Sequence, residues 1–124
     1  MRIALAERES EVMQVLWESG ASTVSEVREK LGAALAYTTV LTILRKLEAK
    51  GYVGHEESGR AHRYSARIAR DAARRSALRD LAKRLFKGSS ELLLVHLVED
   101  QGVTEQQATR IRELLEKHLR KSKP

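Results

Sequence analysis

The stretch from residue 37 to residue 51 carries the side chains with the clearest chemical potential. One side of it combines small hydroxyl groups with basic groups: Thr38, Thr39, Thr42, Arg45 and Lys46. The other side is apolar with helical spacing: Val40, Ile43, Leu44 and Leu47. Small polar groups followed by Arg and Lys suit a helix in a DNA major groove, where they meet base edges and phosphates. A solvated amphipathic helix is the alternative, so the flanking sequence must decide.

The excess positive charge of the chain is concentrated around the same stretch. The 124 residues carry a formal net charge of +6. Residues 37–87 hold 13 basic and 5 acidic groups, whereas residues 1–36 hold 4 and 6, and residues 88–124 hold 6 of each. A focused basic segment is typical of a polyanion-binding protein. An ordinary solvated basic face is the competing explanation, and we favour nucleic acid.

Residues for catalysis or metal binding do not form a recognisable pattern. The chain has no Cys, which excludes disulfides and thiolate metal sites and fits the cytoplasm. No histidine has a second at metal-ligand spacing, and none accompanies a nucleophile: His55, His62, His96 and His118. No Gly-rich phosphate loop is present, and the most apolar run, 92–98, is too short to span a bilayer. We therefore expect no enzyme, catalytic residue, metal, cofactor or membrane insertion.

Two shorter helices are expected ahead of the basic one. The first covers Glu7 to Ser19, with an apolar stripe and a C-terminal stop at Gly20. A capping box from Thr23 to Glu26 opens the second, which ends at Gly32. The second helix and the basic helix that follows it are short and are joined by a tight connection. Together they form a helix-turn-helix, in which the basic helix carries the polar face.

The residue period changes from 3.6 to 2 after Gly51, which predicts a β-hairpin. Its strands are expected at 52–56 and 61–65, around a Gly-containing turn at 57–60. A hairpin directly behind a helix-turn-helix is a wing, whose side chains would reach phosphates or the minor groove. A bare surface hairpin is the less favoured alternative. The predicted DNA contacts are Thr38, Thr39, Thr42, Arg45, Lys46, Lys50, Arg60, His62 and Arg63.

Three further helices are expected after the hairpin. A basic helix covers 67–87, a short helix around 92–98 is apolar nearly all round and should be buried, and a capping box from Thr104 to Gln107 opens the last. A winged-helix domain at 1–66 is already complete, so the helical region 67–124 should bury its apolar faces against a second copy. The predicted dimerisation residues are Leu78, Leu81, Leu85, Leu93, Leu97, Ile111, Leu115 and Leu119. The fold class is mainly α with a small β-hairpin.

The motifs described so far resemble one family of bacterial regulators. The segments Glu-Val-Met-Gln-Val-Leu-Trp-Glu, Tyr-Thr-Thr-Val-Leu-Thr-Ile-Leu-Arg-Lys-Leu and Lys-Gly-Tyr-Val are similar to the BlaI/MecI/CopY penicillinase-repressor family. The resemblance implies a homodimer that binds a palindromic operator in double-stranded DNA and blocks transcription. It also implies release by cleavage in the dimerisation region, with a membrane-bound sensor metalloprotease as partner. The position aligned with the Asn-Phe bond cut in some members lies near Val95-His96.

Three functions follow from these observations, in order of preference. The first is the dimeric repressor of double-stranded DNA. The second is a winged-helix protein-interaction module without sequence-specific DNA binding. The third is a ligand-sensing regulator with a pocket among the C-terminal helices, which requires a cavity where the Leu-rich 92–98 segment suggests a filled interior.

Overall fold

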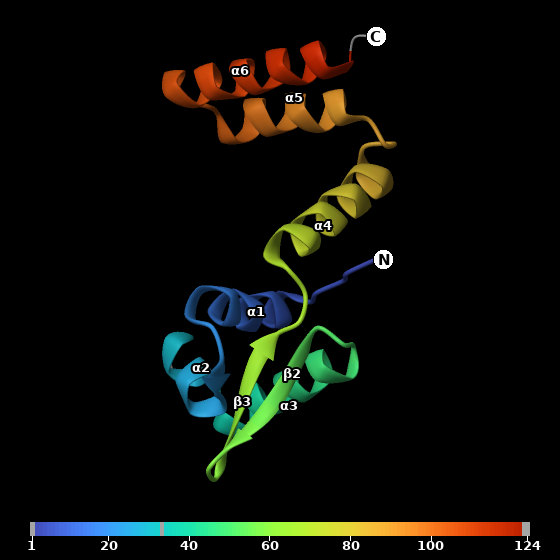
Figure 1. Cartoon of the computed structure of the whole chain (residues 1–124). Helices are drawn as coiled ribbons and strands as arrows, with labels where there is room; N and C mark the ends of the chain where they lie inside the picture. The colour runs from blue at the N-terminus through green and yellow to red at the C-terminus, as the bar shows by residue number, and fades with distance from the viewer. Residues whose placement is uncertain (1, 33, 123–124) are drawn as a thin grey trace. The chain divides into compact units, whose positions relative to one another are not determined.

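The computed structural model describes residues 2–32 and 34–122, and this part of the chain is mainly helical with one small sheet (Figure 1). The residues up to Arg79 form one compact unit and those from Asp80 onward form a second. We call these the first and second units. The elements are α1 (Glu7–Ser19), β1 (Ser22–Thr23), α2 (Val24–Lys30), α3 (Tyr37–Ala49), β2 (Val53–Ser58), β3 (Ala61–Ala66), α4 (Arg70–Leu85), α5 (Ser90–Gln101) and α6 (Glu105–Ser122).

Helices α1, α2 and α3 pack around one apolar core. The apolar stripe predicted for the basic helix faces this core, and Val40, Leu44 and Leu47 are fully buried. They contact residues on α1, α2 and the sheet, including Val12, Met13, Val27 and Val53. Fully burying one such side chain stabilises a fold by about 1.5–3 kcal/mol. The expected bounds of the first helix are confirmed, and the core fixes which face of α3 remains outside.

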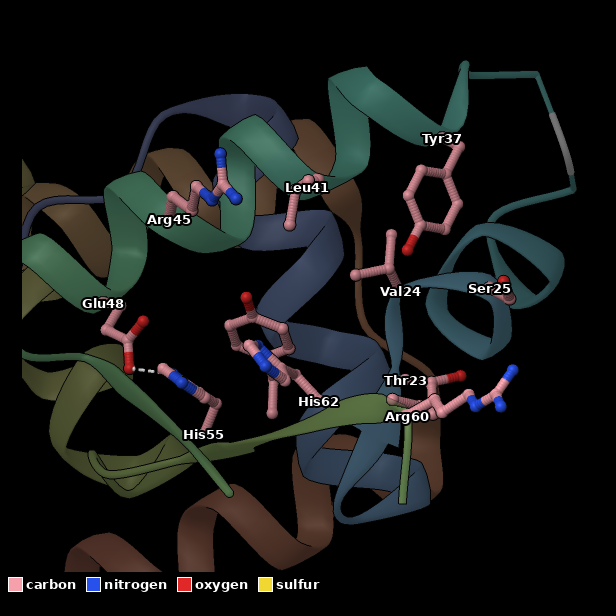
Figure 2. Close-up of a pocket in the computed structure, with 12 residues that line it drawn as sticks. Thr23, Val24, Ser25, Tyr37, Leu41, Arg45, Glu48, His55, Arg60 and His62 are labelled. Carbon is pink, nitrogen blue, oxygen red and sulfur yellow. Dashed lines mark hydrogen bonds and ion pairs between the residues drawn. The ribbon is translucent and has the colours of Figure 1, made fainter. Parts of the chain in front are cut away.

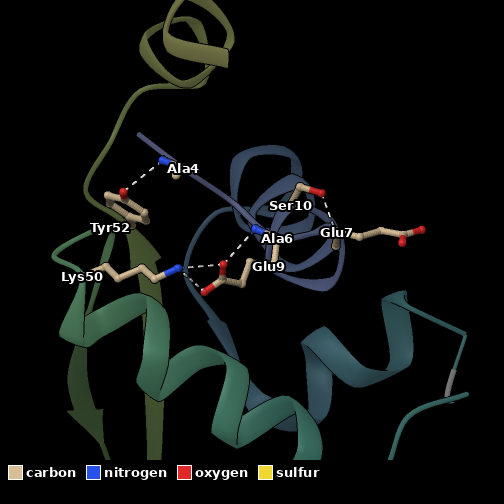
Figure 3. Close-up of polar contacts among 7 residues, drawn as sticks. All are labelled: Ala4, Ala6, Glu7, Glu9, Ser10, Lys50 and Tyr52. Atoms are coloured by element: carbon tan, nitrogen blue, oxygen red, sulfur yellow. Dashed lines mark hydrogen bonds and ion pairs between the residues drawn. The ribbon is translucent and has the colours of Figure 1, made fainter. Parts of the chain in front are cut away.

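Helix α1 begins without a side-chain cap because Ala6 has no hydroxyl or carboxylate. Glu9 compensates in part, since its Oε1 accepts the Ala6 N–H at 2.9 Å (Figure 3). The same carboxylate accepts two hydrogen bonds from Lys50 Nζ, at 2.8 and 2.9 Å. Burial raises the pKa of Glu9, but the bonds from Lys50 and Ala6 outweigh it, so the pKa lies below its ordinary value. Glu9 therefore ties the start of α1 to the end of α3.

The hairpin belongs to a three-stranded antiparallel sheet with the order β1-β3-β2. Strand β1 is an addition to the sequence-based picture, and it pairs Thr23 with Arg63. Strands β2 and β3 are also longer than predicted, leaving a two-residue turn at Gly59 and Arg60. Gly59 adopts a φ of +66°, which glycine accommodates at little cost. The capping box at Thr23 is confirmed, with Thr23 and Glu26 bonded to each other's amides.

The start of α4 packs into the first unit. The predicted helix begins at 67, whereas α4 begins at Arg70. Ala73 and Ser76 are buried, and Ser76 Oγ accepts the Ile3 N–H at 2.7 Å. The Trp17 indole N–H donates to the Ile68 carbonyl at 3.0 Å. The first compact unit therefore extends to Arg79, beyond residue 66. The expected boundary at residue 66 between a winged-helix domain and a dimerisation region stays a prediction.

The second unit contains no buried residue in α5 or α6 among those the structure describes. The expectation that 92–98 is buried within the chain is wrong, because Leu92, Leu94 and Leu97 are 40%, 39% and 54% exposed. An element that is apolar on all sides needs neighbours on all sides, and one chain supplies too few. The capping box at Thr104 is confirmed by its reciprocal bonds with Gln107. Within the described residues, no helix is long and apolar enough to cross a membrane.

Candidate nucleic-acid interface

The outward face of α3 presents the predicted base-reading side chains together. Thr38, Thr39, Thr42, Arg45 and Lys46 are all exposed, opposite the buried stripe. The Thr42 hydroxyl donates to the Thr38 carbonyl at 2.9 Å. In that conformation Thr42 offers a hydrogen-bond acceptor and a methyl group to a ligand, which suits a base-edge amino group or a thymine methyl.

Two concave surfaces flank this face of α3. One is a shallow depression of about 390 Å³, lined by Thr38, Thr39, Thr42, Ile43 and Lys46 together with Arg8 of α1. The other is a deeper hollow of about 470 Å³ between α3, the start of α2 and the hairpin (Figure 2). Helix α3 therefore divides its polar side chains between an α1 side and a hairpin side.

The hairpin hollow gathers basic, aromatic and imidazole groups. Its lining includes Arg45 and Glu48 of α3, Arg60 at the hairpin turn and His62 of β3. Tyr64 forms part of its floor and is almost completely buried. Burial raises the pKa of the Tyr64 hydroxyl, and the nearby Glu48 carboxylate raises it further. The Arg45 guanidinium acts in the opposite direction, but the pKa of Tyr64 stays above its ordinary value.

A hydrogen-bonded and stacked arrangement spans this hollow. His55 Nδ1 lies 2.6 Å from Glu48 Oε2, which joins β2 to α3. The His55 ring stacks on the His62 ring, with centroids 4.6 Å apart and planes inclined by 14°. His55 also lies against Tyr64, at a centroid distance of 5.4 Å. This cluster holds the hairpin against α3.

Two predicted phosphate contacts already have partners within the chain. Lys50 is paired with Glu9, as described above. Arg63 donates to Glu26 Oε1 at 3.0 Å and to the Ala21 carbonyl at 3.3 Å. Hydrogen bonds from Thr23 lower the pKa of Glu26, and Arg63 lowers it further. For both residues, contact with a phosphate would compete with an existing bond. Arg45, Lys46 and Arg60 form no ion pair with the residues that the structure describes.

The hollow contains residues that sequence reasoning did not select. His55 and Tyr37 line it, and Glu48 closes one end, while Arg8 lines the depression on the other side of α3. The strand period contained part of this signal, because residues 62 and 64 fall on one face of β3. The pairing of His55 with Tyr64 places His55 on that same face.

The penicillinase repressor family matches residues 5–117. The transcriptional regulator BlaI of Mycobacterium tuberculosis is 40% identical over 110 residues, covering 86% of this chain and 80% of that protein. The penicillinase repressor of Bacillus licheniformis is 22% identical over 121 residues, covering 96% and 94%.

The fold is also similar to that of a solved regulator. A transcriptional regulator of Thermotoga maritima superposes with a TM-score of 0.50 at 19% identity, covering 91% of this chain and 72% of that one. That likeness confirms the winged-helix fold class expected from the sequence. The family consists of transcriptional regulators and not of enzymes, as expected. The chain belongs to the penicillinase repressor family of winged-helix transcriptional repressors.

Proposed function

We propose that two copies of this chain bind a palindromic operator in double-stranded DNA and thereby block transcription. Each copy would place the outward face of α3 in a major groove, with the hairpin against the adjoining backbone. One observation carries this proposal. The outward face of α3 exposes Thr38, Thr39, Thr42, Arg45 and Lys46, while the opposite face of the same helix is buried in the core. Hydroxyl and guanidinium groups in that position suit both base edges and phosphates.

The DNA contacts that we propose differ in how readily they are available. Arg45, Lys46 and Arg60 would neutralise phosphates, and Thr38, Thr39 and Thr42 would meet base edges. Lys50 and Arg63 would have to exchange an internal ion pair for a phosphate. We expect these two to contribute less to affinity than the first three.

The second unit, together with Leu78 at the end of the first, would supply the dimer contacts. Of the predicted dimerisation residues, Leu78, Leu81, Leu85, Leu97, Leu115 and Leu119 are all exposed within one chain, and Leu93 and Ile111 are half-buried. This many exposed apolar side chains in one region are typical of a protein interface. A two-fold arrangement would repeat α3 in both halves of a symmetric operator.

An apolar groove of about 360 Å³ in the second unit bears on the ligand-sensing alternative. It is lined by Leu81, Leu85, Phe86, Leu93, His96 and Leu97, together with Asp100 and Gln101. Four of these are leucines that we assign to the dimer interface. We therefore assign the groove to a side chain of the second copy in preference to a small ligand.

Relief of repression would come from cleavage in the second unit, as its resemblance to the family implies. Val95 is 43% exposed, and α5 has no buried residue. Few buried contacts favour local opening, which a protease requires. The partner would be a membrane-bound sensor metalloprotease. Mass spectrometry of the chain recovered from β-lactam-treated and untreated cultures should show a fragment ending near Val95-His96 only after treatment.

The central experiment is selection of bound sequences from random duplexes by the full chain. We expect enrichment of a symmetric sequence whose half-sites lie about one DNA turn, or a multiple of it, apart. Sedimentation of the free protein should give a dimer at micromolar concentration. A monomer throughout, or no enriched sequence, would contradict the proposal and favour the protein-interaction module.

A further inference from the structure

The stacked imidazoles of His55 and His62 lie in the hairpin hollow, where the proposed DNA backbone would pass. His62 was expected to contact DNA, but His55 and the contact between the two rings have no assigned role in DNA binding. The His62 side chain is 47% exposed, and that of His55 is 33% exposed. Both rings are therefore open to a ligand that enters the hollow (Figure 2).

The charged groups around the two rings come from three sides. Helix α3 contributes Arg45 and Glu48, strand β2 contributes Glu57, and the hairpin turn contributes Arg60. The phenols of Tyr37 and Tyr64 complete the titratable surroundings. Two arginines and two glutamates therefore surround the rings, and their formal charges balance.

The two imidazoles differ in how a proton on each would be balanced. Glu48 Oε2 lies 2.6 Å from His55 Nδ1, and a carboxylate can only accept, so Nδ1 carries a hydrogen in this contact. A positive charge on His55 therefore has an adjacent counter-charge. His62 Nε2 lies 3.7 Å from Glu57 Oε1, whose side chain is 79% exposed and largely solvated.

The carboxylate paired with His62 is therefore the solvated one of Glu57. A phosphodiester oxygen placed against His62 would be a closer partner, because it accepts a hydrogen bond from the ring and its negative charge favours the protonated imidazole.

We propose that a backbone phosphate of duplex DNA lies against His62 in this hollow, and that the His55–His62 stack takes up a proton when DNA binds. This inference rests on the proposed function, since it assumes that the hairpin faces a duplex. The protonated protein is then the tighter-binding form. DNA affinity rises as pH falls through the range in which imidazoles titrate.

The test is the affinity of the full chain for a fluorescently labelled 30-base-pair duplex of random sequence between pH 6 and pH 8, at constant ionic strength in phosphate-free buffers. A phosphate contact is independent of base sequence, so no operator is required. Uptake of up to one proton predicts binding about three- to tenfold tighter at pH 6 than at pH 8. His62→Gln should reduce that ratio to less than about twofold by the same linkage.

The control is His118→Gln, which removes an exposed imidazole from α6 and should retain the full pH dependence. The salt dependence of DNA affinity is a second measurement, and a purely structural role of His62 would not change it. The slope of log affinity against log salt should be steeper at pH 6 by up to about 0.9 for the wild type, and equal at both pH values for His62→Gln. Circular dichroism should show that both variants are folded. If His62→Gln is not folded, His55→Gln takes its place in the same measurements.

A wild-type affinity that is flat from pH 6 to pH 8 would overturn the inference, and so would a pH dependence that survives in His62→Gln. Either result leaves the proposed function standing if duplex selection at pH 7.5 still enriches a symmetric sequence. Failure of that selection contradicts the proposed function itself. The two failures are therefore distinguishable.

Discussion

The two units of this chain differ in where their apolar side chains lie. In the first unit, the three helices and the sheet enclose a core in which Val12, Met13, Leu44 and Leu47 have no exposed surface. In the second unit, Leu85 and Leu119 are 68% and 64% exposed, and α5 and α6 bury nothing. The first unit thus contains its own core, whereas the second leaves its large apolar side chains exposed.

This difference separates two kinds of stability. Burial within one chain stabilises the first unit whatever the protein concentration. If the second unit is covered by another copy, its stability depends on protomer concentration through mass action. The same chain would then contain a DNA-reading unit that is stable alone and an assembly unit that is not.

The strongest test removes part of the first unit's core. Leu44→Ala should lower the free energy of unfolding by about 2–5 kcal/mol, because it leaves a cavity at a fully buried position. Urea denaturation at several protein concentrations measures the change. The same truncation at Leu119, which is 64% exposed within the chain, should change the first unit's stability by less than about 0.5 kcal/mol. Equal losses at both positions would remove the distinction between the units.

Introducing a charge into the apolar face of the second unit should separate the copies. Leu97→Glu should weaken the dimer by at least about 2 kcal/mol, because an unpaired carboxylate would be desolvated in the interface. Analytical ultracentrifugation measures the dissociation constant. Gln106→Glu places the same charge at an exposed position near the start of α6 and should leave the dimer intact. An undisturbed Leu97→Glu dimer would show that this face is not the contact.

Removing a basic side chain from α3 should weaken DNA binding without affecting dimer assembly. Arg45→Ala should weaken operator binding by about 1–3 kcal/mol, since it removes a guanidinium from the exposed face of the helix. Fluorescence anisotropy at fixed salt measures this loss. Arg112→Ala removes the same group from α6 and serves as the matched variant. Comparable weakening by both would mean that general charge, and not the position on α3, determines affinity.

Neutralising Glu9 should have the smallest effect and a defined pH dependence. The folded-state pKa lies below the ordinary value of 4.5, so the stabilisation is present above about pH 4.5 and is lost as the pH falls through the lower folded value. Glu9→Gln should therefore cost about 1–2 kcal/mol at pH 7, with a smaller difference at pH 3. Glu11→Gln breaks an exposed pair with Arg8 and should cost less than about 0.5 kcal/mol. A constant difference across pH would exclude the ion pair as the cause.

The helices of the first unit could be predicted because local signals agree with tertiary packing there. The spacing of Val40, Leu44 and Leu47 defines the buried side of α3, and that side faces the core. The box at Thr23 marks the start of α2 for a reason that involves only four residues. Strand β1 has two residues, too few for any period, and it exists only because β3 lies beside it.

Much of the candidate site could not be predicted because it depends on residues distant in sequence. Lys50 was expected to face DNA, yet its partner Glu9 is 41 positions away. The hairpin hollow requires α3, β2 and β3 together, so His55 showed no distinguishing neighbour in the sequence. The expected burial of 92–98 was wrong for a related reason. Composition shows that a segment is apolar but not whether its own chain can enclose it.

The bond from Trp17 to the Ile68 carbonyl has a practical consequence for separating the units by spectroscopy. The chain has one tryptophan and three tyrosines, at positions 17, 37, 52 and 64, and all of them lie in the first unit. Intrinsic fluorescence therefore monitors that unit alone, and its emission wavelength should report the local joint between α1 and the segment leading into α4. Far-ultraviolet dichroism monitors every helix. A lag between the two signals during dilution or heating would reveal the second unit melting first, without any label.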